Sequence, residues 1–171
     1  MTETPLRLAL AESLDEVLEK MFFIRSFGEP QNLADEPFVT AHLTFEGSPP
    51  GWLTLRITAA AARSVAADFL GEEEPELSDR QIGEVVCELA NMICGSVLSR
   101  VESTTTFRLA TPQLVTSAEE GDPAGPAPFG LGISAIPPTA ATHAAEIGNG
   151  AMVVIFNMET PAWSTVEKPE F

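Results

Sequence analysis

The 171-residue sequence has no tyrosine, only two cysteines and two histidines, and nine lysine or arginine residues. The histidines His42 and His143 stand alone, and no cysteine or histidine spacing matches a zinc or iron pattern. The chain also lacks a phosphate-binding glycine loop, a nucleophile elbow and a cysteine paired with a nearby histidine. We therefore expect no metal site in the chain and no self-contained hydrolase or nucleotide enzyme.

The shortage of basic residues, set against 25 aspartates and glutamates, gives a formal net charge of -16. A chain with this charge repels polyanions, which argues against nucleic acids and anionic membranes as partners. A partner that offers lysine or arginine fits better. Acids away from any site are expected only to maintain solubility.

A targeting segment is not expected either. The N-terminus has acids early and no basic start followed by an apolar run, and no window reaches the apolar length of a membrane span. The expected location is the cytoplasm. Cys87 and Cys94 are seven residues apart, about 10 Å along a helix, which is too far for a disulfide. We expect both to flank the core as small apolar residues.

The segment from Asp79 to Val101 has the periodicity of a long amphipathic helix. Its apolar face comprises Ile82, Val85, Val86, Leu89, Ile93 and Val97. The opposite face carries a stripe whose members are four, three and four residues apart, namely Glu84, Glu88, Asn91 and Gly95.

Acids and amides are ordinary on the solvated side of any helix, so the pair Glu88 and Asn91 alone is weak evidence for a functional surface. Asparagine is a mediocre helix former, however, and an interior glycine costs a helix roughly 1 kcal/mol relative to alanine. A glycine on the same stripe indicates that another surface approaches it closely. The stripe is therefore interpreted as a docking face.

Two more helices are predicted at residues 6–22 and 59–70, with Thr58 as the cap of the second and Gly71 as its end. Their expected core faces include Met21 and Phe69. Ser78 is a candidate cap for the long helix. Alternation and composition predict strands at residues 38–46, 52–58, 104–109, 129–136 and 151–158.

The first two strands form a hairpin, and Pro112 interrupts the third or places it at an edge. The last strand is mostly apolar and is expected at the centre of a sheet. These elements predict an α+β fold in which an antiparallel sheet packs against helices. We expect residues 1–171 to form one domain, with an irregular tail from about residue 160.

The run GEVVCELANMICGSVLSRV followed by TPQLV resembles the signature of the CheX/CheC/FliY phosphatases of bacterial chemotaxis. In that family a helix carries Glu-x-x-Asn and a proline follows about twenty residues later, which here are Glu88, Asn91 and Pro112. The order of the elements resembles CheX over most of the chain. The chain has one Glu-x-x-Asn stripe, as in CheX, whereas CheC resembles a doubled version of this arrangement. The family usually has Asp or Ser where this chain has Glu84.

The resemblance implies hydrolysis of the phospho-aspartate of a CheY-like response regulator. Phosphoryl transfer depends mainly on positioning and charge stabilisation, and the implied role of Asn91 is to hold the attacking water in line. Glu88 would dock on a receiver lysine. The partner-binding residues would be Glu84, Glu88, Asn91 and Gly95. No cofactor of its own is implied, because the Mg²⁺ belongs to the receiver.

Two other functions stay open. One is a non-catalytic CheX-like module that docks on a receiver or signalling partner and acts by occupancy. The other is a structural dimer subunit, because CheX-like proteins resemble homodimers in which late strands continue the sheet between subunits. The strand at residues 151–158 is the one expected to pair in that way.

Overall fold

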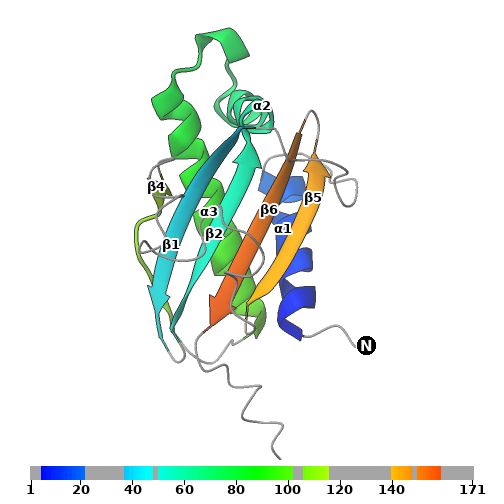
Figure 1. Cartoon of the computed structure of the whole chain (residues 1–171), viewed down its shortest axis with the longest axis vertical. Coiled ribbons are helices and arrows are strands. Elements are labelled where there is room, and N and C mark those ends of the chain that lie inside the picture. Colours follow the sequence, from blue (N-terminus) through cyan, green and yellow to red (C-terminus); the bar gives the residue numbers. More distant parts are fainter. Residues whose placement is uncertain are drawn as a thin grey trace, which may run out of the picture.

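The computed structural model describes residues 5–21, 37–47, 50–101, 106–115, 140–147 and 150–158. Its described strands form an antiparallel sheet with helices α1 and α3 side by side on one face and α2 at one end (Figure 1). The elements in chain order are α1 (Pro5–Met21), β1 (Phe38–Glu46), β2 (Gly51–Thr58), α2 (Ala59–Leu70), η1 (Glu74–Glu76), α3 (Asp79–Val101), β3 (Arg108–Leu109), β4 (Gln113–Val115), β5 (Ala141–Ile147) and β6 (Gly150–Met158).

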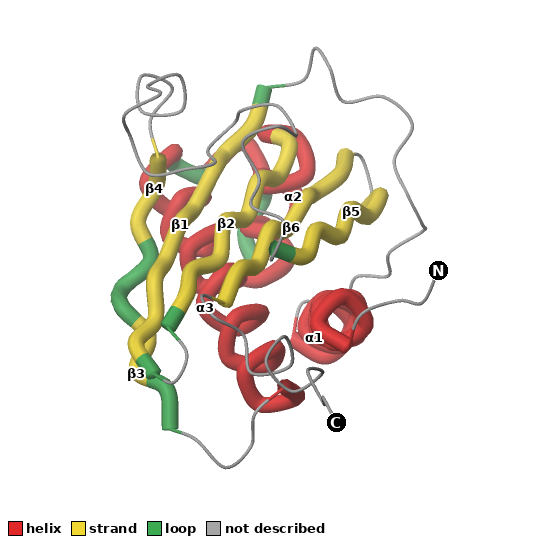
Figure 2. Tube along the Cα trace, turned by 60° about the horizontal axis from the view of Figure 1, so that its bottom comes forward, coloured by secondary structure: helices red, strands yellow, loops and turns green. Residues whose placement is uncertain are grey.

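The strand order in this sheet is β3-β1-β2-β6-β5, and β4 pairs with β1 further along the same edge as β3. The view in Figure 2 shows α1 and α3 packed beneath the strands. The predicted class, an antiparallel sheet packed against helices, is confirmed.

Strand β6 lies between β2 and β5, so its central position is also confirmed. This position corrects the expectation that it joins two subunits. Both edges of β6 are already hydrogen-bonded within the chain, so it has no free edge to offer a second copy.

The core lies between the sheet and the helices. All six residues expected on the apolar face of α3 are buried there. Two other expected core residues, Met21 and Phe69, are 48% and 39% exposed. Both lie in the last turn of their helices, where neighbouring turns cover a side chain from one direction only.

Both predicted ends of α2 and the predicted start of α3 are confirmed. The Oγ1 of Thr58 accepts a hydrogen bond from the backbone N–H of Ala61 at 3.4 Å, and Gly71 ends α2 with a φ of 69°. The Oγ of Ser78 accepts from the N–H of Gln81 at 3.1 Å, while the Gln81 side chain accepts from the N–H of Ser78 at 2.9 Å. This reciprocal capping box fixes the start of α3.

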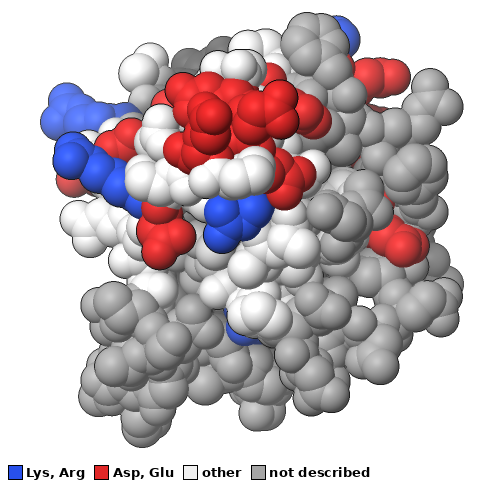
Figure 3. All heavy atoms as spheres, turned by 90° about the horizontal axis from the view of Figure 1, so that it is seen from above, with Lys and Arg blue, Asp and Glu red and all other residues white. Residues whose placement is uncertain are grey.

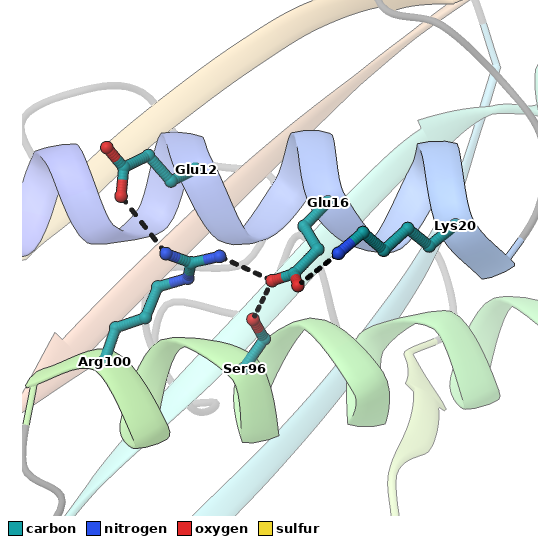
Figure 4. A network of polar contacts seen from close by, with 5 residues as sticks. All are labelled: Glu12, Glu16, Lys20, Ser96 and Arg100. Carbon is teal, nitrogen blue, oxygen red and sulfur yellow. Dashed lines mark hydrogen bonds and ion pairs between the residues drawn. The ribbon is translucent and has the colours of Figure 1, made fainter.

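Helix α1 is held on α3 by charge as well as by apolar packing. The Arg100 side chain donates to Glu12 at 3.2 Å and to Glu16, which also accepts from Ser96 and Lys20 (Figure 4). Glu12 and Glu16, which were expected only to maintain solubility, therefore contact α3.

Two parts of the sheet differ from the predicted elements. Strand β5 was missed, because its sequence ATHAAEI has small residues and no regular alternation. The predicted strand at residues 104–109 is short, and Pro112 separates β3 from β4 as expected. The strand predicted at residues 129–136 and the tail from residue 160 lie outside the described residues.

Among the helices that the structure describes, α3 is long and apolar enough, by length and composition, to cross a membrane. This finding corrects the expectation that no window reaches the apolar length of a membrane span. More than half of this window, 56%, is buried inside the fold. A core helix meets the same criterion, and the apolar face of α3 packs on the sheet.

Candidate functional site

A groove of about 560 Å³ runs along the side of α3 that faces away from the core. One of its walls is α3 and the other is the segment that contains β3 and β4. The residues that line it are Arg80, Gly83, Glu84, Cys87, Glu88, Asn91, Leu109, Ala110, Thr111, Pro112 and Leu114. Figure 1 shows why these segments meet, since β4 lies along the edge of β1 next to α3.

Three of the four residues of the predicted stripe lie in this groove. Glu84 and Glu88 are exposed, and Asn91 is half-buried. Pro112, which follows Asn91 by 21 positions in the sequence, lines the same groove. The structure thus brings together the glutamate, the asparagine and the proline of the signature.

Gly95 does not line the groove. A Cβ atom built at this position meets no other atom within 4 Å, so no part of the described chain requires a glycine there. Its role in partner binding stays a prediction. Within α3, the glycine that another segment approaches closely is Gly83, which was not singled out from the sequence.

Arg80 is a second groove residue that sequence reasoning missed. Its Nε donates to the Oε2 of Glu84 at 3.0 Å, one turn along the helix. Both side chains are largely exposed, so the pair contributes little to stability. It nevertheless places a cation beside Glu84, the position at which the chain departs from the CheX-like signature. The spacing of four residues between Arg80 and Glu84 was the signal in the sequence that could have predicted this ion pair.

The cysteine in the groove is not an activated nucleophile. Burial, together with the Glu84 carboxylate, raises the pKa of the half-buried Cys87 thiol, which is therefore protonated at neutral pH. Burial also raises the pKa of Cys94. Both thiols are free, and Cys94 is fully buried, as the sequence analysis expected of a residue beside the core.

The chemistry available in the groove is therefore that of carboxylates and an amide. The carboxylates of Glu84 and Glu88 can accept from a cationic partner, and the amide of Asn91 can both donate to and accept from a water molecule. Within the described ranges, no group of three or more His, Cys, Asp or Glu side chains could hold a metal ion. These groups can orient a water and bind a cation.

Acidic side chains gather at the end of the molecule from which α3 begins (Figure 3). The described acids in this part of the chain are Glu72, Glu73, Glu74, Glu76 and Asp79. Their charge continues along α3 to Glu84 and Glu88 in the groove. This distribution attracts a positively charged partner surface toward the groove, and salt weakens the attraction.

Comparison with known proteins gives one family match and several similar folds. The sequence profile of the family described as "Chemotaxis phosphatase CheX" matches residues 39–124, half of the chain. This range contains β1 except its first residue, together with β2, α2, α3 and the second wall of the groove. No curated protein sequence matches the chain.

Three solved structures illustrate the similarity of fold. The chemotaxis protein CheX of Desulfovibrio desulfuricans is 20% identical, with a TM-score of 0.65 over 91% of this chain and 100% of that chain. The CheX of Vibrio vulnificus is 19% identical, with a TM-score of 0.65 over 92% and 100%. The CheX–CheY–BeF3–Mg²⁺ complex of Borrelia burgdorferi is 15% identical, with a TM-score of 0.58 over 88% and 96%.

Proposed function

The chain belongs to the CheX family of chemotaxis phosphatases, and from this premise we propose that it hydrolyses the phospho-aspartate of a CheY-like response regulator. The observation that carries the proposal is the placement of Glu88, Asn91 and Pro112 in one open groove. The complex of a CheX with CheY in Borrelia burgdorferi supports a partner of this class.

Asn91 is the proposed catalytic residue that positions water. Hydrolysis of an acyl phosphate needs a water molecule held in line with the phosphorus, and little covalent help from the protein. An amide suits this task because it offers both a donor and an acceptor. The half-buried position of Asn91 limits the directions in which the amide can point.

Glu88 is the proposed docking residue. Its carboxylate lies one turn before Asn91 on α3 and is exposed in the groove. A lysine beside the phosphorylated aspartate of the receiver would donate to it. This ion pair would hold Asn91 at working distance from the phosphorus.

The remaining components of the reaction come from the receiver. The acyl phosphate and its Mg²⁺ belong to the partner, so the chain is proposed to bind no cofactor of its own.

The proposed place of action is the cytoplasm, where response regulators act.

We also propose a homodimer, with a different contact strand from the one expected from the sequence. Strand β5 lies at the end of the described sheet, opposite β3 and β4. An edge strand presents backbone N–H and C=O groups that a second copy could pair with. This edge is remote from the groove, so dimerisation would leave the groove accessible.

The test is phosphate release from a phosphorylated CheY-like receiver of the same genome, with catalytic amounts of the wild-type chain or Asn91→Ala. We expect wild type to accelerate release, and Asn91→Ala to lose about 100-fold or more of the acceleration while it still binds the receiver. Equal activity of the two proteins would overturn the role of Asn91.

The second candidate, a non-catalytic binding module, is favoured by one observation, the replacement of the usual Asp or Ser by Glu84. In that case both proteins bind the receiver and neither accelerates release at substoichiometric amounts. A catalyst turns over many receivers, whereas a binder acts only in proportion to its amount.

A further inference from the structure

The side chain of Leu114 lies against the backbone of Gly83. A Cβ atom built on Gly83 falls 2.5 Å from Cδ1 and 3.5 Å from Cγ of Leu114. The first distance is shorter than carbon atoms tolerate, so any larger residue at position 83 would displace Leu114. With Leu114 in this rotamer, position 83 has space for glycine only, and a larger residue would require the end of the Leu114 side chain to shift.

The register of β4 explains why Leu114 points at α3. Leu114 pairs with Ala41 of β1, and directly paired residues project from the same face of a sheet. Ala41 is fully buried in the core on the helix-facing side. Leu114 therefore projects toward α3, while the neighbouring Gln113 projects to the opposite face.

This contact joins the two walls of the groove. Strand β4 is three residues long and directly follows Pro112, and Leu114 is 45% exposed at the groove surface. On the other wall, Gly83 precedes Glu84 and lies one turn before Cys87. The position of Leu114 on Gly83 therefore sets how far the Pro112 segment lies from α3.

We propose that Gly83 and Leu114 are positioning residues that fix the width of the groove and, through it, the position of Pro112 relative to Asn91. The expected effect on catalysis rests on the proposed phosphatase function, whereas the expected effect on the width of the groove does not. Glycine costs the helix stability relative to alanine, and the contact with Leu114 accounts for its presence at position 83.

The experiment compares four proteins: wild type, Gly83→Ala, Leu114→Ala and the double variant. The first readout is the reaction rate of Cys87 with a thiol reagent, which needs no partner and no catalysis. Cys87 lines the groove, whereas Cys94 is fully buried and slow to react. The second readout is kcat for phosphate release from the phosphorylated receiver, with thermal unfolding recorded for each protein.

Gly83→Ala alone is expected to raise the Cys87 reaction rate several-fold and to lower kcat about tenfold, because sub-ångström shifts in a positioned site are costly. In the Leu114→Ala background the leucine that would clash with a larger residue at position 83 is absent. There, Gly83→Ala is expected to change the Cys87 reaction rate and kcat by no more than about twofold. An equal effect of Gly83→Ala in both backgrounds, or no effect in either, would overturn the proposal.

A matched control on the same helix is Gly95→Ala, since a Cβ atom there meets nothing within 4 Å. It is expected to leave the Cys87 reaction rate unchanged. The readouts also separate the two proposals. If the wild-type chain releases no phosphate but Cys87 shows the expected dependence on Leu114, the phosphatase function fails and the positioning contact stands.

Discussion

The guanidinium of Arg80 and the carboxylate of Glu84 form an ion pair along one turn of α3, with Nε 3.0 Å from Oε2, and both residues line the groove. The pair neutralises part of the acidic surface next to Glu88. Glu84 therefore does not act as an isolated extra charge at the position where the CheX-like signature usually has Asp or Ser.

Removal of Arg80 should accelerate association with the receiver. Arg80→Ala leaves Glu84 unpaired and makes the groove more negative, which strengthens attraction to a lysine-bearing surface. We expect an association rate about two- to fivefold higher at low salt, a difference that disappears at high salt. Stopped-flow association kinetics over a salt series measure it.

The matched control for this variant is Lys20→Ala. It also removes one positive charge and one ion pair between residues four positions apart, here Lys20 and Glu16, but this pair lies on α1. The control should change the association rate far less. Equal acceleration by both variants would show that net charge, and not the groove, governs association.

Glu88 is expected to determine affinity and its dependence on salt. Glu88→Gln keeps the shape of the side chain but removes the charge that would bind the receiver lysine. We expect about tenfold weaker binding to the receiver and a flatter dependence of affinity on salt, as measured by calorimetry at several ionic strengths. Glu19→Gln, an exposed acid of α1, is the control, and equal losses in the two variants would contradict the docking role.

Gly95→Ala tests the part of the predicted docking stripe that lies outside the groove. The new Cβ meets nothing in the chain, so the free energy of unfolding should rise by up to about 1 kcal/mol from helix propensity. If the receiver approaches Gly95 closely, the affinity of the variant for the receiver should fall in spite of its higher stability. Unchanged affinity would restrict the docking surface to Glu84, Glu88 and Asn91.

His42 should make stability depend on pH. Its Nδ1 lies 2.9 Å from the Oγ1 of Thr54, and burial lowers the pKa of His42 to about 4. The unfolded chain takes up a proton near pH 6.5, so the unfolded state binds more protons than the folded state between about pH 4 and 6.5. The free energy of unfolding therefore falls as the pH drops through this range.

His42→Gln removes that titration while it keeps a polar side chain near Thr54. We expect the decline in stability between pH 6.5 and pH 4 to be smaller by on the order of 1 to 2 kcal/mol in the variant. Urea unfolding at several pH values measures the difference. His143→Gln is the control, and parallel pH profiles for wild type and His42→Gln would contradict the assignment.

Much of the fold could be predicted because its signals are local. The apolar face of α3, the caps Thr58 and Ser78, and the end at Gly71 all depend on residues within a few positions of each other. Strand β1 was predicted with its observed bounds, because its apolar residues alternate. Strand β5 was not predicted, because a run of small residues has no periodic pattern and acquires its conformation from pairing with β6.

By itself, the sequence determined the stripe of Glu84, Glu88 and Asn91, because helical geometry places residues three and four positions apart on one side. Only the tertiary structure decided that Pro112 faces this stripe and that Leu114 rests on Gly83. Those contacts depend on the pairing of β4 with β1, which joins residues more than 70 positions apart. No local periodicity encodes such a register, since it is selected by the packing of the whole sheet against α3.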